Sequence, residues 1–214
     1  MKEILHAEQR NYLDSFDQET DTLLLEMEDF ANKNDVPILS RDSAGLMELL
    51  IQMNNPERVL EIGTAIAYTT IRIARNLKKG SKIHTIEFSE NNSRLARVYV
   101  KKSGLSKKIK LLFGDAKKVM PTLKKKYDFI FLDADKEDYQ NLFEQAMKLL
   151  KKNGVLFVDN LLWHGYTASK EVPDKYKTST KYIRDFNNIF MNHPRLKTTL
   201  VPVGDGIGLG IRMK

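Results

Sequence analysis

The chain has 214 residues, of which 42% are hydrophobic and 29% are charged, so it is long enough to bury a core and too apolar to be disordered. Its mean hydropathy is −0.42, and its longest apolar runs, FIFL and VLFV, fall far short of the roughly 20 residues that a membrane-spanning helix needs. The absence of cysteine excludes a disulfide scaffold, a thiolate nucleophile and any Cys-ligated metal. The first residues lack the apolar centre of a signal peptide, so we expect a cytoplasmic protein with no membrane partner.

The net charge of +7 is distributed unevenly along the chain. Residues 1–42 carry a net charge of −7, residues 78–126 carry +12, and the remainder is close to balance at +2. A basic block of this size is compatible with a polyanionic partner such as RNA. It is equally compatible with lysines that only solvate the ends of helices, and charge alone leaves both interpretations open.

The first 55 residues are predicted to be helical. Apolar side chains recur at offsets of three and four between residues 20 and 31, which is the spacing of one helix face. Pro37 interrupts this pattern, and Ser40 is a plausible N-cap for a second helix over residues 42–53. We therefore expect residues 1–55 to form a helical N-terminal extension.

From residue 58 onward, strand patterns alternate with helix patterns. The predicted strands cover residues 58–62, 82–87, 109–113, 127–133 and 154–159, and the predicted helices lie near 67–78, 89–103, 115–124 and 137–151. Helix-sized connections between short apolar strands imply right-handed crossovers and a parallel sheet with both faces covered. A helix near 177–192 then precedes two strands joined by a Gly-Asp-Gly turn, which predicts an antiparallel hairpin. The predicted fold is a single α/β domain over residues 1–214, with a doubly wound, Rossmann-like, mostly parallel seven-stranded sheet in residues 56–214.

In such sheets ligands bind beyond the carboxyl ends of the strands, so the residues that close each strand are informative. The turn after the first strand keeps only Gly63 of the glycine pattern that binds a pyrophosphate, which argues against NAD and favours a cofactor without phosphates. Glu87 closes the second strand, where it can accept hydrogen bonds from ribose hydroxyls. Asp115 follows the third strand and can reach an adenine amine, cap the next helix, or do both.

The strongest signal lies after the fourth and fifth strands. Asp133 ends one strand, and Asp159 and Asn160 end the next. Neighbouring strands are about 4.8 Å apart, so these side chains can converge on one ion. They supply only oxygen ligands, which Mg²⁺, Ca²⁺ and Mn²⁺ prefer over zinc. The alternative is that they are turn formers or caps, as acidic residues at strand ends often are.

The succession VLEIGTAIAYTT, IHTIEFSE, FGDA, YDFIFLDADK and GVLFVDNLLWHG resembles the metal-dependent, S-adenosylmethionine-using O-methyltransferases of the catechol and caffeoyl-CoA type. The resemblance covers essentially the whole chain, and among members it is most similar to the bacterial tRNA 5-hydroxyuridine methyltransferases. It implies a divalent metal at Asp133, Asp159 and Asn160, and proton abstraction by Lys136. It also implies a site for S-adenosylmethionine made by Gly63, Thr64, Tyr68, Glu87, Asp115, Ala116 and Asp133. Ala65 and Ala67 depart from the family pattern, which usually has glycine at these two positions.

The resemblance also bears on the acceptor and the assembly. A chelating acceptor needs two neighbouring oxygens, which both catechols and 5-hydroxyuridine have. We favour tRNA, because the segment from Trp163 to Arg184 carries Lys170, Lys175, Lys177 and Lys181 against only Glu171 and Asp174. Trp163 or Tyr166 could stack on a splayed base, although Trp163 could equally be an ordinary packing residue. The alternatives are a small-molecule catechol or acyl-CoA methyltransferase and a non-catalytic RNA- or nucleotide-binding module. The resemblance further suggests a homodimer.

Overall fold

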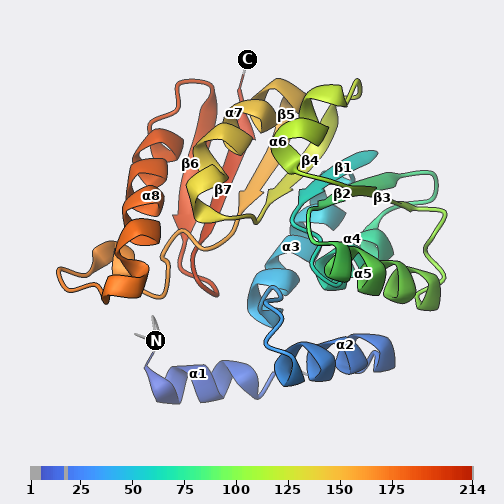
Figure 1. Cartoon of the computed structure of the whole chain (residues 1–214), viewed down its shortest axis with the longest axis horizontal. Coiled ribbons are helices and arrows are strands. Elements are labelled where there is room, and N and C mark those ends of the chain that lie inside the picture. Colours follow the sequence, from blue (N-terminus) through green and yellow to red (C-terminus); the bar gives the residue numbers. More distant parts are fainter. Residues whose placement is uncertain (1–5, 17–18, 214) are drawn as a thin grey trace.

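A seven-stranded sheet organises the computed structural model, which describes residues 6–16 and 19–213 (Figure 1). The strands are β1 (Arg58–Ile62), β2 (Lys82–Glu87), β3 (Ile109–Phe113), β4 (Tyr127–Leu132), β5 (Leu150–Val158), β6 (Leu196–Val201) and β7 (Ile207–Arg212). Their order across the sheet is β3-β2-β1-β4-β5-β7-β6, with β7 antiparallel to both β5 and β6. The remaining pairs are parallel, so the predicted doubly wound sheet with a C-terminal hairpin is confirmed.

Helices cover both faces of the sheet, and each face has its own hydrophobic core. On one face α3 (Arg41–Asn54), α4 (Tyr68–Asn76) and α5 (Glu90–Lys102) pack with α2 (Thr22–Lys33) against side chains such as Val59, Phe129 and Phe157. On the other face α7 (Tyr139–Leu149) and α8 (Asp174–Met191) cover Ile62, Leu132 and their neighbours. Successive side chains of a strand point to opposite faces, so a strand such as β4 contributes Phe129 and Phe131 to one core and Ile130 and Leu132 to the other.

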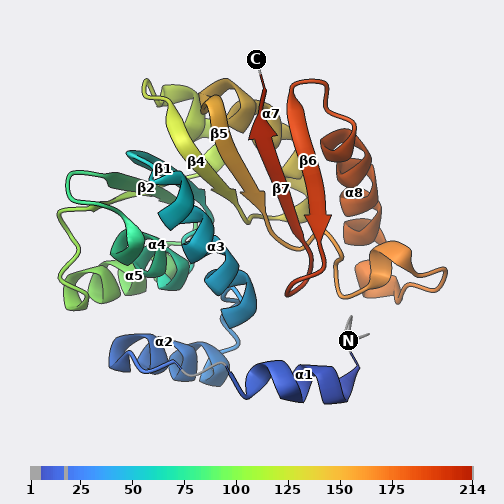
Figure 2. The same cartoon turned by 180° about the vertical axis from the view of Figure 1, so that it is seen from behind.

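The N-terminal extension, predicted to be helical, begins with α1 (Ala7–Asp14), a helix whose individual bounds were not predicted. None of its residues is buried, and Tyr12 is 66% exposed. The two predicted helices of the extension are present as α2, with Asp21 as its N-cap, and α3, with Ser40 as its N-cap. Figures 1 and 2 show α1 and α2 below the sheet, on the side towards which the arrows of β4 and β5 point.

Two predicted elements are shorter or differently placed in the structure. The helix expected over residues 115–124 is a single turn, α6 (Ala116–Val119), followed by a 3-10 turn, η1 (Met120–Thr122). Pro121 in this segment has no backbone N–H to continue an α-helix. Similarly, α7 ends at Leu149 and β5 begins at Leu150, four residues before the predicted strand. Two further 3-10 turns, η2 (Lys136–Asp138) and η3 (Tyr166–Ala168), follow β4 and β5. Among the described residues, no helix combines the length and apolar character that crossing a bilayer requires.

Candidate active site

The polar residues predicted after β4 and β5 do come together. The backbone N–H of Asp133 donates to the carbonyl of Ile62 at 2.9 Å, and that of Asp159 donates to the carbonyl of Leu132 at 3.2 Å. These bonds continue the pairing of β1, β4 and β5 by one residue, so the side chains leave the sheet at the same level. The carboxyl ends of three neighbouring strands therefore form the floor of the site.

Lys136 is the centre of this cluster. Its Nζ donates to Asn160 Oδ1 at 2.6 Å, to Tyr139 Oη at 2.8 Å and to the carbonyl of Ala134 at 3.0 Å, and it lies 3.3 Å from Asp133 Oδ1. The side chain is only 13% exposed. Lys136 is the first residue of the 3-10 turn η2, which begins three residues after Asp133 and returns the chain to the strand ends.

Tyr139 is a member of this cluster that sequence reasoning missed. Its side chain is fully buried, and its hydroxyl accepts from Lys136 and donates to the carbonyl of Asp159 at 3.1 Å. Burial raises the pKa of Tyr139, and the nearby charges of Asp133 and Asp159 act in the same direction. Tyr139 therefore stays a neutral phenol that connects the lysine to the end of β5.

Asp159 carries the largest electrostatic perturbation among the predicted metal ligands. Its side chain accepts from the backbone N–H of Asn160 at 2.7 Å. Burial, followed by the charge of Asp133, raises the pKa of Asp159 to about 7. Within residues 6–16 and 19–213 no three histidine, cysteine or carboxylate side chains are grouped to hold a metal, and the third predicted ligand is the amide of Asn160.

The turn after β1 is shaped by the close approach of β4. Gly63 has φ +98°, and a Cβ atom built on it would lie 1.8 Å from the carbonyl oxygen of Asp133. Ala65 and Ala67 also have positive φ values, 46° and 72°. These are the two positions at which the family pattern has glycine, so both alanines adopt a backbone conformation that costs an L-residue about 1–2 kcal/mol. Thr64 is buried, with its Oγ1 2.5 Å from that of Thr85.

Glu87 ends β2, and Asp115 follows the end of β3. Glu87 accepts from the backbone N–H of Ala65 at 2.8 Å through one oxygen and from that of Ser89 at 2.7 Å through the other. Burial raises the pKa of Glu87, although these backbone donors oppose the rise. Asp115 caps α6 by accepting from the backbone N–H of Lys117 at 2.8 Å, so the capping role that the sequence left open is present. Ala116 is the first residue of that helix.

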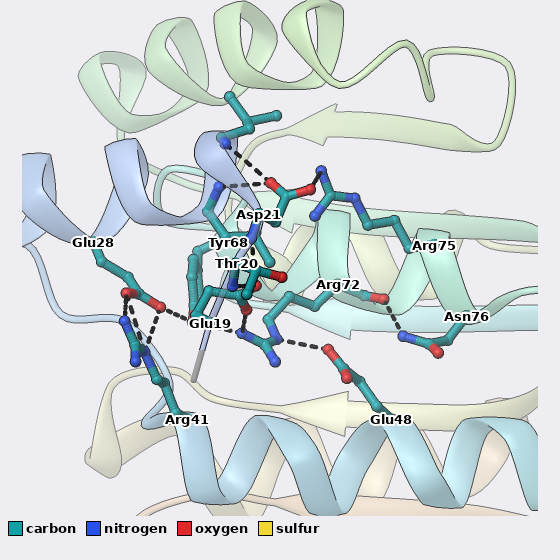
Figure 3. A network of polar contacts seen from close by, with 12 residues as sticks. Glu19, Thr20, Asp21, Glu28, Arg41, Glu48, Tyr68, Arg72, Arg75 and Asn76 are labelled. Carbon is teal, nitrogen blue, oxygen red and sulfur yellow. Dashed lines mark hydrogen bonds and ion pairs between the residues drawn. The ribbon is translucent and has the colours of Figure 1, made fainter. Parts of the chain in front are cut away.

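Tyr68 lies in a network that joins the N-terminal extension to α4 (Figure 3). Its buried hydroxyl donates to Glu28 of α2 and accepts from Arg72 at 2.9 Å. Arg72 also donates to Glu19 at 2.9 Å and to Glu48 at 2.6 Å. The acidic side chains of the extension therefore bind cations of α4, at the end of the sheet where the predicted cofactor turn lies.

Two further residues at this end of the sheet received no role from the sequence. Glu61 of β1 is fully buried, its Oε2 accepts from Thr70, and its Oε1 has no hydrogen-bond partner among the described residues. Burial raises the pKa of Glu61 to about 8. Asp205, in the turn between β6 and β7, accepts from Asn160 Nδ2 at 3.4 Å and from the backbone N–H of His164. Its Gly-Asp-Gly context indicated a turn but not its contact with the strand-five loop.

An aromatic cluster follows β5 and lies over Lys136. The ring of Trp163 is 5.4 Å from Lys136 Nζ and 4.8 Å from the ring of His164, and Tyr166 stacks on Tyr176 at 5.2 Å. Trp163 and His164 both have positive φ, so this loop is held in a strained conformation. Trp163 Nε1 and His164 Nδ1 are buried and make no hydrogen bond within the described part of the chain. Trp163 also packs on the core, so the packing role left open for it is real.

The basic residues predicted between Trp163 and Arg184 fall into two groups, those that contact other groups of the protein and those that are unpaired within the described residues. Arg184 donates to the carbonyls of Tyr166, Thr167 and Ser169, so it holds η3 in place. Lys177 pairs with Asp174 at 2.6 Å. Lys170, Lys175 and Lys181 are exposed and have no ion pair in the described ranges.

Comparison with known proteins identifies the family. The model of the O-methyltransferase family matches residues 14–213. A caffeoyl-CoA O-methyltransferase from Medicago sativa is 32% identical over 186 residues, which cover 82% of this chain and 74% of that protein. The Tapetum-specific methyltransferase 1 from Arabidopsis thaliana is 30% identical over 178 residues, with 80% and 76% coverage.

Solved structures agree with the family match. A candidate caffeoyl-CoA O-methyltransferase from Staphylococcus aureus superposes with a TM-score of 0.89 at 28% identity, covering 96% of this chain and 99% of that one. An O-methyltransferase from Bacillus cereus in complex with S-adenosylhomocysteine gives a TM-score of 0.83 at 26% identity, with 94% and 96% coverage. The chain therefore belongs to the O-methyltransferase family and is an S-adenosylmethionine-dependent O-methyltransferase of the caffeoyl-CoA type.

Proposed function

We propose that the chain methylates a ring hydroxyl that has a second oxygen on the neighbouring atom, with a divalent metal held by Asp133, Asp159 and Asn160. The observation that carries the proposal is the position of Lys136, whose Nζ contacts both Asp133 and Asn160 where β4 and β5 end. An acceptor hydroxyl must lose its proton before or during methyl transfer, and a base beside oxygen ligands serves that step. A site that only bound nucleotides would need no such base.

The donors at this site fit a hard divalent cation. All three side chains present oxygens, and Asp133 is close enough to Asp159 to raise the pKa of that carboxyl. A positive ion beside the pair would favour the ionised form of both carboxylates. Three protein ligands leave coordination positions for water and for the two acceptor oxygens. Such an ion, when bound, favours the deprotonated form of a hydroxyl that it contacts.

The chain's own residues then have defined tasks. In its neutral amine form, Lys136 accepts the proton of the acceptor hydroxyl and becomes an ammonium, and Tyr139 and the carbonyl of Ala134 hold its Nζ in place. Each oxygen of Glu87 accepts one backbone N–H, which leaves lone pairs for the ribose hydroxyls of the cofactor. Once the Glu61 carboxyl is ionised, its Oε1, partnerless among the described residues, is an acceptor for the amino group in the methionine part of the cofactor, against the turn from Gly63 through Thr64. Asp115 and Ala116 border the adenine.

The aromatic cluster supports a flat acceptor. Trp163 and the stacked pair of Tyr166 and Tyr176 present ring faces, and the unpaired Trp163 Nε1 is a donor for a polar ring atom. Both 5-hydroxyuridine in tRNA and a small catechol meet this description. The exposed Lys170, Lys175 and Lys181 favour tRNA, because phosphates would neutralise them. The name of the Medicago sativa relative, a caffeoyl-CoA O-methyltransferase, favours the small-molecule alternative with an acyl-CoA acceptor.

The test is transfer of a labelled methyl group from S-adenosylmethionine to three acceptors: tRNA that carries 5-hydroxyuridine, catechol and caffeoyl-CoA. We expect label in tRNA, its loss in excess EDTA and its return with Mg²⁺. Asp159→Asn should abolish transfer, and Lys136→Arg should abolish it while retaining the positive charge, because Arg is not deprotonated in proteins.

Asp135→Asn is the matched control, because Asp135 is exposed and its side chain makes no hydrogen bond within the described ranges. It should retain activity. Label in catechol or caffeoyl-CoA alone would select the small-molecule alternative. Full activity in excess EDTA would remove the metal from the mechanism.

A further inference from the structure

We propose that the amino ends of the parallel strands form a second binding surface, for the phosphate backbone of a nucleic-acid double helix. Six exposed lysines, which we call the amino-end belt, define it: Lys78, Lys82, Lys107, Lys125, Lys126 and Lys152. Lys78 precedes β2 and Lys82 begins it. Lys107 precedes β3, Lys125 and Lys126 precede β4, and Lys152 lies in the first half of β5. Lys136 lies beyond the carboxyl end of β4, so the belt and the active site occupy opposite ends of the sheet.

Contacts among neighbouring segments show that the belt is continuous. The Nζ of Lys82 donates to the carbonyl of Lys107. Arg58 pairs in register with Lys82, and its Nε donates to the carbonyl of Lys126 at 3.1 Å. Lys78 and Lys152 line one open groove of about 360 Å³, together with Lys151 and Asp128. The belt therefore runs along the amino edge from β3 to β5.

The charge of the belt is only partly balanced by the protein, because Glu57 and Asp128 are the two carboxylates that line the groove of Lys78 and Lys152. None of the six lysines has an ion pair in residues 6–16 and 19–213. Asp128, in the groove, is already engaged by Lys151 at 2.7 Å and by the backbone N–H of Arg58 at 2.9 Å. The acidic N-terminal extension lies elsewhere, because Glu19 and Glu28 bind Arg72 and Arg41 (Figure 3). A row of like charges attracts a polyanion, and binding it releases counterions.

The side chains around the belt favour a double helix over other polyanions. Proteins that bind single strands stack the bases on aromatic rings. Peripheral membrane helices insert aromatic and aliphatic side chains between lipids. The exposed aromatic residues of the described chain lie outside the belt, with Phe88 and Phe113 at the carboxyl ends of β2 and β3. Lysines without aromatic neighbours contact phosphates and read no sequence.

The test compares two triple variants of equal net charge in the full-length protein. Lys78→Gln/Lys125→Gln/Lys152→Gln removes three belt lysines whose side chains make no hydrogen bond in the described ranges. The control, Lys101→Gln/Lys118→Gln/Lys197→Gln, removes three exposed lysines from α5, α6 and β6. Fluorescence anisotropy measures binding to a 20-base-pair RNA duplex, a DNA duplex of equal length and phosphatidylserine vesicles.

We expect the affinity of the wild-type protein for duplex to fall about 10³-fold between 50 and 200 mM salt if roughly six phosphates are engaged. The belt variant should lower the slope of log affinity against log salt by about 2.7, and the control should leave it nearly unchanged. Equal losses of affinity for the RNA and DNA duplexes would identify the phosphate backbone itself as the ligand. A loss of affinity confined to RNA would identify the A-form helix. Both outcomes support the proposal.

Equal slopes for the two variants would overturn the proposal, because net charge alone would then explain binding. A belt-dependent loss on vesicles without one on duplexes would overturn it in favour of a lipid surface. Binding is measured without cofactor, and methyl transfer to any small acceptor is measured in parallel. The proposal can therefore fail while the methyltransferase function stands, and the reverse also holds.

Discussion

Replacing Gly63 with alanine should destabilise the protein through two separable effects. Its φ of +98° is unfavourable for an L-residue by about 1–2 kcal/mol. The new Cβ would also lie 1.8 Å from the carbonyl oxygen of Asp133, which must move. Overpacking of this kind costs about 1–3 kcal/mol. We therefore expect Gly63→Ala to lower the free energy of unfolding by about 2–5 kcal/mol.

Gly80→Ala separates the two effects. Gly80 has a similar φ of +92°, but nothing lies within 4 Å of a Cβ built there. This variant has only the backbone cost, and in both variants alanine restricts the unfolded chain and offsets about 0.4–1 kcal/mol of the loss. Urea unfolding of the two variants measures the difference between their unfolding free energies, provided that their m-values are equal. If Gly63→Ala is no more destabilising than Gly80→Ala, β1 and β4 do not approach each other as closely as the structure shows.

Two further predictions concern buried groups near the site. Because burial raises the pKa of Glu61 to about 8 from 4.5, the folded chain retains a proton there that the unfolded chain has lost, so stability falls as pH rises between these values. The difference in unfolding free energy between the wild type and Glu61→Gln should therefore shrink from pH 5 to pH 8, and a constant difference in urea titrations would contradict the shift. Tyr139→Phe removes one hydrogen bond to Lys136 and should lower kcat about tenfold, the equivalent of about 1.4 kcal/mol, without changing calorimetric affinity for S-adenosylmethionine. An equal loss of cofactor affinity would show that Tyr139 acts on the fold of the site as a whole.

The sheet and the cluster at its carboxyl edge were predictable because both follow from periodicity. Once five apolar strands alternate with helices, their carboxyl ends must share one edge, which brings Asp133, Lys136 and Asn160 within hydrogen-bonding distance. The predicted boundaries of individual helices and strands were less accurate than the predicted order of elements. Residues 150–153 continue the apparent helix before them in composition, and their assignment to β5 depends on pairing with β4.

The site residues that the sequence analysis missed were hidden from it for one physical reason, which is that their roles depend on tertiary contacts. Tyr139 and Glu61 have roles that depend on tertiary burial, and an isolated sequence window does not reveal which side of a helix or strand will be enclosed. Helix α1 has no buried residue, so it produces no apolar stripe for a pattern to detect. Asp205 contacts Asn160 across 45 positions of sequence, through a hairpin turn whose docking depends on the loop after β5.

The order of the strands leaves β3 and β6 as the two borders of the sheet. A border strand with free backbone groups can recruit the same strand of another molecule and so begin aggregation. Both borders have a lysine facing outward, Lys110 in β3 and Lys197 in β6. Bringing two such strands together would oppose like charges, which discourages cross-molecule pairing. Part of the chain's positive charge thus protects its solubility. Neutralising Lys110 would remove this repulsion from β3, the strand that also carries the exposed Phe113.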